Sequence, residues 1–365
     1  MSDFKTVKNK QNKKKLKGRG SWSEPDARYL VHTRHEIDDG WDNDAEENSI
    51  VTSVTAEKPK TILSRNKSPD IPFELSINPY RGCEHGCIYC YARPSHAYVD
   101  LSSGIDFETK LFYKSNAAAL LEKELAAKAY ECSPIALGTN TDPYQPVERR
   151  YQITRQLIEV LSERNHPLTI VTKSSLVERD IDLLAPMAEK NLVKIFISVT
   201  TLDHELMQRM EPRATAPKRR LQTLVKLHEA GIPTGMMFAP VIPVINDSEM
   251  EAILERGTAT GISNAGYVLL RLPYEIKGLF REWLDNHYPL KTSHVLNMIA
   301  DSRGGKLNDP EFHSRLTGQG VYADMIRKRF HKACRKLGLN VGENIQLDTS
   351  QFIKPVLKEQ QYELF

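Results

Sequence analysis

The sequence predicts an α/β protein built on a partial (β/α)6 TIM-like barrel. Two observations point to this fold. Short apolar runs alternate with longer amphipathic stretches between about residues 70 and 275 of the 365-residue chain, and such alternation is typical of parallel strands joined by helices. The runs number six, whereas a closed barrel of this type has eight strands. We therefore expect an open barrel.

The six expected strands are near-continuous apolar runs, as parallel strands covered on both faces are. In chain order they are Phe73–Pro79, Pro134–Thr139, Leu168–Thr172, Lys194–Val199, Gly235–Val241 and Tyr267–Leu272. Five stretches between them carry apolar residues at helical spacing. These expected helices are Ala117–Tyr130, Arg149–Arg164, Ser175–Lys190, Pro217–Ala230 and Asp247–Thr260. The carboxyl ends of the strands are where catalytic groups gather in such folds.

The first 60 residues are expected to form a disordered tail with a basic and an acidic half. Residues 1–20 carry eight Lys or Arg, and residues 36–47 carry seven acids and no base. Blocks of like charge cannot bury a core. The basic half either contacts a polyanion or only aids solubility.

The remaining chain divides into three regions. Residues 70–290 are expected to form the barrel, 291–340 a helical extension, and 341–365 a C-terminal tail. Apolar residues at helical spacing predict the extension, whose opposite face is basic between Arg327 and Lys336.

The amino-acid composition indicates the cellular compartment. Hydrophobic residues make up 40% and charged residues 27% of the chain. No run approaches the ~18 apolar residues of a membrane span, and the lysine-rich start does not resemble a secretory signal. We expect a cytoplasmic protein without a membrane partner. Clustered cysteines in that reducing compartment indicate metal binding or catalysis before disulfides.

Three of the five cysteines lie in the stretch RGCEHGCIYCYARP, directly after the first expected strand. Cys83, Cys87 and Cys90 have the spacing C-x3-C-x2-C, while Cys132 and Cys334 are isolated. A structural zinc site normally takes four ligands. Three thiolates on one short loop suit a cubane cluster in which one iron has no protein ligand and binds an exogenous group. A zinc-bound loop and purely structural thiols are the alternatives.

With Tyr89 just before the third cysteine, this motif resembles that of the radical S-adenosylmethionine (SAM) enzymes, and the resemblance covers roughly residues 70–275. It implies one 4Fe–4S cluster on Cys83, Cys87 and Cys90, with SAM chelating the fourth iron. It also implies an external one-electron donor of the flavodoxin or ferredoxin type. Reduction then cleaves SAM to a 5′-deoxyadenosyl radical that abstracts hydrogen.

The resemblance also suggests roles for polar residues at the strand ends. After the second strand, Thr141 and Asp142 are candidates to accept from the methionyl ammonium of SAM, although Asp-Pro also favours a simple turn. Lys173, after the third strand, is a candidate for the carboxylate of SAM or a substrate phosphate. Ser198 ends the fourth strand and can contact the carboxylate or ribose.

Two arginines complete the candidate site. Arg213, in the sequence Glu-Pro-Arg, can clamp a carboxylate bidentately. Arg271, at the end of the sixth strand, can line the substrate end. For each strand-end residue the alternative is a polar group that simply faces solvent.

Within the superfamily, RGCEHGCIYCYAR, T-D-P-Y-Q-P-x-E and T-K-S resemble the branch related to spore photoproduct lyase, often described as DNA repair photolyase-like. Those enzymes act on a thymine dimer in DNA. The lyase carries a hydrogen-donating cysteine after the second strand, where this sequence has Thr139 and Asn140. The resemblance therefore supports the cofactors more strongly than it supports dimer repair.

Three functions stay open. The first is a radical SAM enzyme acting on nucleic acid or a nucleotide-containing substrate, and the second is the same chemistry on a peptide or small metabolite. The third is a non-enzymatic iron–sulfur or zinc protein that binds nucleic acid. A separate link to DNA comes from the last five residues, in which Gln361, Leu364 and Phe365 resemble the pentapeptide that binds the bacterial sliding clamp. Tyr362 departs from that pattern, and the alternative is a terminus that folds back onto the barrel or is simply frayed.

Overall fold

The structure is a computed structural model that describes residues 19–29, 51–341 and 346–356. Its main sheet has seven strands in the order β10-β9-β8-β7-β6-β3-β2. Six of them are parallel, and β2 pairs antiparallel with β3. The bounds are β2 (Leu63–Arg65), β3 (Leu75–Ile77), β6 (Ile135–Leu137), β7 (Leu168–Thr172), β8 (Val193–Ser198), β9 (Thr234–Val241) and β10 (Asn264–Leu269). The prediction of a partial barrel with six parallel strands is confirmed.

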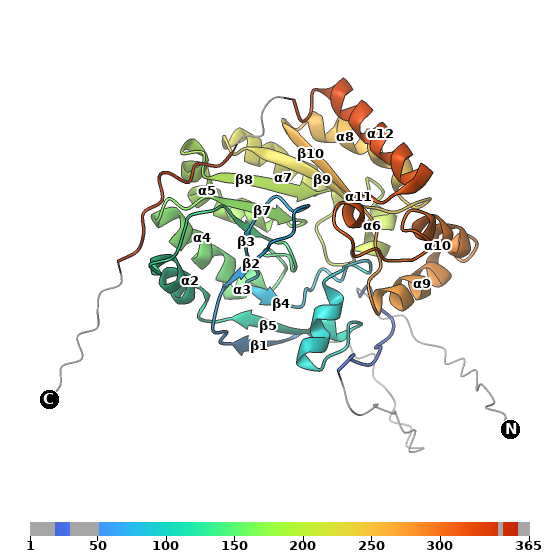
Figure 1. The fold of residues 1–365 in the computed structure, drawn as a ribbon, viewed down its shortest axis with the longest axis horizontal. Coiled ribbons are helices and arrows are strands. Elements are labelled where there is room, and N and C mark those ends of the chain that lie inside the picture. The colour runs from blue at the N-terminus through green and yellow to red at the C-terminus, as the bar shows by residue number, and fades with distance from the viewer. Residues whose placement is uncertain (1–18, 30–50, 342–345, 357–365) are drawn as a thin grey trace, which may run out of the picture.

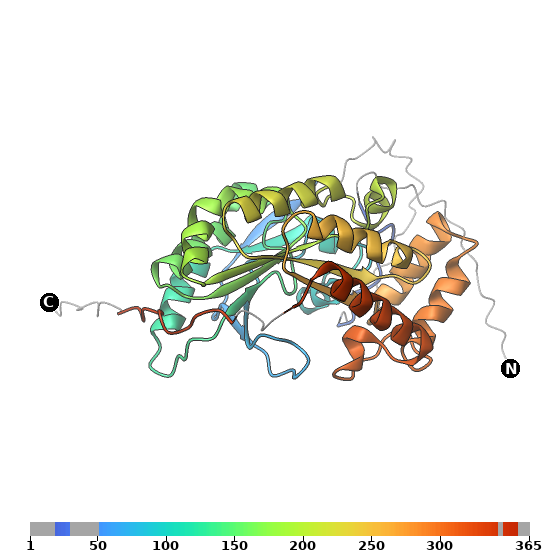
Figure 2. The same cartoon turned by 90° about the horizontal axis from the view of Figure 1, so that it is seen from above.

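Helices cover the outer side of this curved sheet (Figures 1 and 2). They are α2 (Ala117–Ala126), α4 (Ile153–Glu163), α5 (Ile181–Glu189), α7 (Pro217–Glu229) and α8 (Met250–Thr258). In α4 the apolar side chains recur at helical spacing, and the buried ones, Ile153, Leu157 and Leu161, face the sheet side of the helix. Each helix lies in a strand-to-strand crossover of the kind that parallel pairing requires.

A second, smaller sheet has the order β1-β5-β4, with β1 (Ser53–Glu57), β5 (Lys110–Lys114) and β4 (Tyr80–Arg81). β1 pairs parallel with β5, far along the chain. Two parts of the tail that the sequence assigned to residues 1–60 therefore belong to the fold: residues 19–29 and the segment that contains β1. The physical reason is that both segments are held by distant partners, which charge blocks do not reveal. Residues 1–18 and 30–50 lie outside the described part of the chain.

The helical C-terminal region is confirmed. Residues 291–340 contain α10 (Thr292–Asp301), α11 (Ser314–Thr317) and α12 (Gly320–Leu337), and α9 (Ile276–His287) precedes them within the range expected for the barrel. The buried stripe of α12 runs through Ala323, Ile326, Phe330 and Ala333. Part of its basic face is neutralised, because Arg329 pairs with Glu251 of α8 at 2.6 Å.

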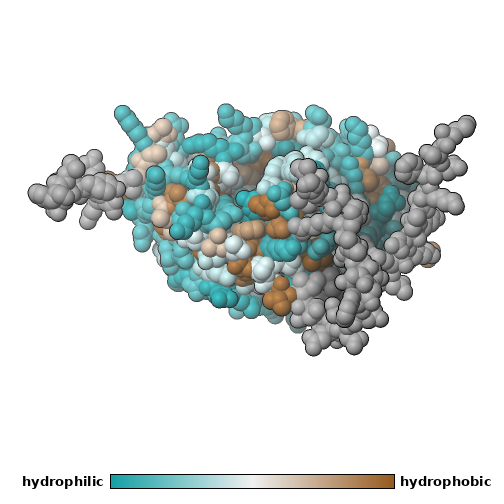
Figure 3. All heavy atoms as spheres, turned by 90° about the horizontal axis from the view of Figure 1, so that it is seen from below, coloured by the Kyte–Doolittle hydropathy of each residue, from teal (hydrophilic) through white to brown (hydrophobic). Residues whose placement is uncertain are grey.

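One face of the molecule, drawn in Figure 3, is largely hydrophilic with hydrophobic residues in separate patches. Such scattered patches are ordinary for a protein surface. No helix in the described ranges is long and apolar enough to cross a membrane.

Candidate functional site

The cysteine loop runs from β4 to the 3-10 helix Arg93–Val99. Two glycines shape it, since Gly82 and Gly86 have φ angles of 75° and 65°, a region that other residues rarely adopt. The backbone amide of Cys83 donates to the Phe107 carbonyl at 2.9 Å. The buried Gln145 side chain holds the loop from the other side, donating to the Gly82 carbonyl at 3.0 Å. The loop is therefore fixed by elements that lie far apart in the sequence.

The three loop cysteines are free thiols, of which Cys83 and Cys87 are buried and Cys90 is partly exposed. Burial raises the pKa of Cys83 and raises that of Cys87 to about 12. A thiolate there needs a strong compensating positive charge, which iron supplies when it is bound. In the described residues no three His, Cys, Asp or Glu side chains converge as one metal ion would require. A cubane does not require this, because each cysteine binds a different iron, so the thiol set fits such a cluster.

A buried network lies beside Cys87 and centres on Glu211, which follows α6 (His204–Met210). Its carboxylate accepts hydrogen bonds from the Tyr89 hydroxyl, from the Thr200 hydroxyl at 2.8 Å and from the Arg220 guanidinium. Burial would raise the pKa of Glu211, but Arg220 and Lys173 lower it overall. Glu211 is therefore a buried carboxylate that anchors the cysteine loop through Tyr89.

Lys173 faces the same network. Its Nζ lies 5.9 Å from the centre of the Tyr89 ring. Burial would lower the pKa of Lys173, but Cys87 and Glu211 outweigh it and raise the pKa. The structure thus brings Lys173 and Tyr89, both named by the sequence, together with Cys87.

Asp142 is already fully engaged. Its Oδ1 accepts from the Thr172 hydroxyl at 2.6 Å and the Tyr144 amide at 2.9 Å. Its Oδ2 accepts from the Lys173 amide at 2.8 Å and lies 3.4 Å from His85 Nδ1. Although burial would raise the pKa of Asp142, His85 and these donors lower it. In this arrangement Asp142 ties the loop after β6 to the end of β7 and to the cysteine loop.

The other predicted contacts are placed less centrally. The Thr141 hydroxyl donates to the Tyr80 carbonyl at 2.8 Å. Ser198 is buried at the end of β8, and its carbonyl accepts from Arg220 at 3.0 Å. Arg213 pairs with Glu84 of the cysteine loop at 3.0 Å. Their contacts with SAM stay predictions, and each now has a partner within the protein.

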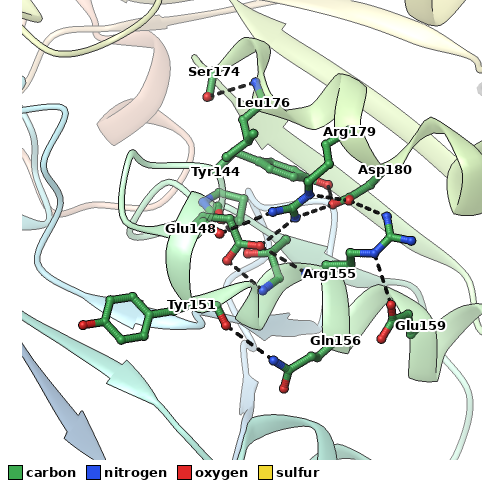
Figure 4. Close-up of polar contacts among 12 residues, drawn as sticks. Tyr144, Glu148, Tyr151, Arg155, Gln156, Glu159, Ser174, Leu176, Arg179 and Asp180 are labelled. Carbon is green, nitrogen blue, oxygen red and sulfur yellow. Dashed lines mark hydrogen bonds and ion pairs between the residues drawn. The ribbon is translucent and has the colours of Figure 1, made fainter.

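A network of polar side chains, drawn in Figure 4, links the loop after β6 to the helical turns after β7. The Tyr144 hydroxyl donates to Asp180 at 3.0 Å, and Asp180 also accepts from Arg155 and Arg179. Arg179 bridges to Glu148 at 2.7 Å. These contacts join the helical turns after β6 and β7. They fix the loop that carries Asp142.

A second buried ion pair braces the cysteine loop, and the sequence did not reveal it. Arg93 donates to the Cys87 carbonyl at 2.9 Å and to the Gly86 carbonyl at 3.0 Å. It also pairs with Glu108 of α1 (Asp106–Thr109), where both side chains are fully buried. The Glu108 carboxylate accepts further from the backbone amides of Gly20 and Ser21, at 3.0 and 2.9 Å.

Three functional candidates were therefore missed, for different reasons. Arg93 stands three residues after Cys90 and could have been noticed from that position. Glu211 was seen only as part of Glu-Pro-Arg, and its partner Arg220 is nine residues away. Gly20 lies in a stretch that charge alone assigned to a tail, and no sequence pattern marks it.

Comparisons with known proteins agree with this geometry. Residues 77–257 match the Radical SAM superfamily. An uncharacterized protein of Mycobacterium tuberculosis (strain ATCC 25618 / H37Rv) is 35% identical over 256 residues, covering 69% of this chain and 74% of the relative. The Radical SAM Nalpha-GlyT isomerase of Pseudomonas phage M6 is 22% identical over 73% of this chain and 52% of its own length.

Among solved structures, spore photoproduct lyase complexed with dinucleoside spore photoproduct is similar, with a TM-score of 0.56 and 16% identity, over 78% of this chain and 80% of that chain. At that identity the likeness concerns the fold alone. The chain belongs to the radical SAM superfamily. The family uses a 4Fe–4S cluster and SAM, and its members need an external electron donor.

Proposed function

We propose that this protein reductively cleaves SAM and directs the resulting radical chemistry at nucleic acid or a nucleotide-containing substrate. When bound, the cluster on Cys83, Cys87 and Cys90 and SAM supply a 5′-deoxyadenosyl radical. The observation that carries the proposal is the meeting of the cysteine loop, through its Tyr89, with Lys173 at the carboxyl end of β7 and with the buried Glu211 after α6. A flavodoxin or ferredoxin is the proposed type of electron donor.

The chain's own residues position the cofactor in this proposal. Lys173 lies beside the cysteine loop and binds the carboxylate of SAM, because a partly buried lysine favours an anion. Glu211 fixes the cysteine loop by accepting a hydrogen bond from Tyr89. Asp142 keeps Lys173 at the end of β7 through the Lys173 amide. Thr141, Ser198 and Arg213 shape the surrounding wall.

A nucleic-acid substrate is supported by three independent features. The fold resembles that of a lyase whose structure holds a dinucleoside photoproduct. Residues 1–18 carry seven lysines, and α12 exposes Lys328, Lys332 and Arg335 on one face. Basic surfaces of this kind attract the phosphate backbone.

The central experiment is an anaerobic assay of 5′-deoxyadenosine formation with and without DNA, followed by mass analysis of the DNA. We expect cleavage to be lost in Cys83→Ala and retained in Cys132→Ala. Lys173→Ala should keep the iron but bind SAM about ten- to a hundredfold more weakly, as expected for loss of a charge-assisted hydrogen bond. Cleavage that survives Cys83→Ala would overturn the cofactor assignment. DNA that neither changes mass nor affects cleavage would favour a peptide or metabolite substrate.

The clamp contact of Gln361, Leu364 and Phe365 stays a separate proposal, since these residues lie outside the described ranges. The described residues that precede them are fixed to the barrel, because the amides of Asp348 and Ile353 donate to the carbonyls of Asn191 and Arg164, which precede β8 and β7. The test is a polarisation assay of the last ten residues against purified clamp, and binding that survives Leu364→Ala with Phe365→Ala would exclude the motif.

A further inference from the structure

Beside Tyr91, at the mouth of the barrel, lies an arginine that no acid neutralises. Arg271 follows β10 and is half-buried. Its guanidinium carbon lies 5.5 Å from the centre of the Tyr91 ring. Within the described ranges its side chain has no hydrogen bond or ion pair, and a half-buried cation of this kind is unusual.

The acids nearest to Arg271 are already used. Asp70 is held by the fork of Arg315 at 2.6 and 2.8 Å. Asp309 accepts from the Ser314 hydroxyl at 2.6 Å and from the Glu311 amide at 2.9 Å. Burial, together with the charge of Arg315, lowers the pKa of Arg271. An added anion would therefore stabilise the charged guanidinium.

Arg271 is also mounted rigidly. The Leu270 amide donates to the Val241 carbonyl and the Leu272 amide to the Leu307 carbonyl, both at 2.9 Å. The buried Arg303 also fixes this segment, because its guanidinium donates to the Leu270 carbonyl at 3.0 Å. A guanidinium on a fixed backbone loses little freedom when it binds an oxyanion, which favours a specific contact.

Tyr91 gives the second half of the site. Its hydroxyl donates to the Thr139 carbonyl after β6, so the ring spans from the cysteine loop to the neighbouring strand end. The side chain is nevertheless 48% exposed. A fixed and accessible aromatic ring next to an unpaired arginine suits a planar group that is followed by an anion.

We propose that Arg271 is the phosphate-binding residue of the substrate site and that it fixes a phosphate next to a base lying on Tyr91. This inference rests on the proposed function and narrows the substrate to a nucleotide whose phosphate lies within reach of Arg271. Both a phosphodiester within a strand and the terminal phosphate of a mononucleotide offer this chemistry.

The test is anaerobic equilibrium binding of a labelled thymidine hexanucleotide across a salt series. We expect Arg271→Gln to weaken binding about tenfold. The slope of log affinity against log salt concentration should also become shallower by about the amount that one phosphate contact contributes. The matched control is Arg281→Gln, which removes the same charge from an exposed position on α9; we expect wild-type binding. Iron content and unfolding midpoint show whether Arg271→Gln is folded.

Two further ligands identify the contact. With a hexanucleotide whose linkages are neutral methylphosphonates, wild type and Arg271→Gln should bind equally. A tenfold loss there as well would overturn the phosphate contact, as would equal effects of Arg271→Gln and Arg281→Gln on the charged strand. Thymidine 5′-monophosphate that shows the same dependence on Arg271 assigns the site to a terminal phosphate.

Failure of the proposed function gives a different result. If wild type binds no hexanucleotide, the nucleic-acid substrate is wrong, and inorganic phosphate then tests the anion site alone. Phosphate should raise the unfolding midpoint of wild type more than that of Arg271→Gln. An equal shift in the two proteins would overturn the anion site.

Discussion

Two segments without regular secondary structure attach to opposite ends of the barrel (Figure 1). Residues 19–29 meet the cysteine loop, and residues 346–356 meet the loops that precede β7 and β8. The first segment is buried at its start, where Arg19, Gly20 and Ser21 are enclosed. The second is mostly exposed; its partly buried Phe352 packs against His166, and Pro355 is its buried residue. Both lie in regions that the sequence assigned to tails.

The difference lies in what each segment completes. Residues 19–29 satisfy a buried carboxylate, Glu108, which in turn holds the arginine under the cysteine loop. Residues 346–356 add apolar contact and a few backbone hydrogen bonds at the loops that precede β7 and β8. Disturbing the first should therefore affect both the iron and stability, and disturbing the second should affect stability alone.

The largest effect is expected from Glu108→Ala. Removing one partner of a fully buried ion pair leaves Arg93 uncompensated, which costs about 3–5 kcal/mol. Because Arg93 also holds the carbonyls of Gly86 and Cys87, we expect iron to be lost as well. Chemical denaturation and iron analysis measure the two effects. Glu108→Gln, which keeps the shape and one acceptor, should lose less of both.

If Glu108→Ala loses stability but keeps its full iron content, the Arg93–Glu108 ion pair is not needed for holding the cluster. That outcome would remove the distinction drawn between the two segments. A Glu108→Ala protein as stable as wild type would mean that the pair is not buried in solution.

The next effect is expected from Gly20→Ala. A Cβ added at Gly20 would lie 1.8 Å from the Gly86 carbonyl oxygen, so the segment must move away from the loop. We expect a cost of about 1–3 kcal/mol, as for overpacking a core, with faster loss of iron in air. Gly278→Ala in α9 is the control, because its added Cβ meets nothing within 4 Å. If both variants behave alike, residues 19–29 do not press on the cysteine loop.

The sequence predicted the six parallel strands and the cysteine loop because each leaves a local pattern. Apolar runs mark β3 and β6 to β10, and spacing marks the three thiols. The role of Gly20 depends on its approach to Gly86, and β1 depends on its pairing with β5, so no local pattern reveals either. Asp142 shows a related limit: the sequence identified a carboxylate at the right strand end, but only the structure shows the backbone amides that occupy it.

At the opposite end, Phe352→Ala should destabilise the protein by about 1–2 kcal/mol, less than a fully buried Phe would. Its ring lies edge-on to His166, with centroids 5.1 Å apart, and 5.7 Å from Tyr130. Iron content and SAM cleavage should match wild type, since these residues do not touch the cysteine loop. Denaturant unfolding and iron analysis test both statements. Loss of iron in this variant would contradict the division between the two ends.

The smallest effect is a pH dependence at that same end. His166 is buried, and burial lowers its pKa to about 4, below the usual value of about 6.5. The unfolded chain therefore takes up the proton first as pH falls. The stabilising contribution of neutral His166 is complete above pH 6.5 and is lost as pH falls toward 4. By pH 5.5 this loss lowers the free energy of unfolding by about 1 kcal/mol. His166→Gln should flatten the dependence of the free energy of unfolding on pH between pH 6.5 and 4.

Phe352→Ala should flatten this dependence in part, because a better hydrated imidazole has a pKa nearer to its usual value. A profile unchanged in both variants would mean that the acid sensitivity of the protein arises elsewhere and that residues 346–356 do not shield His166.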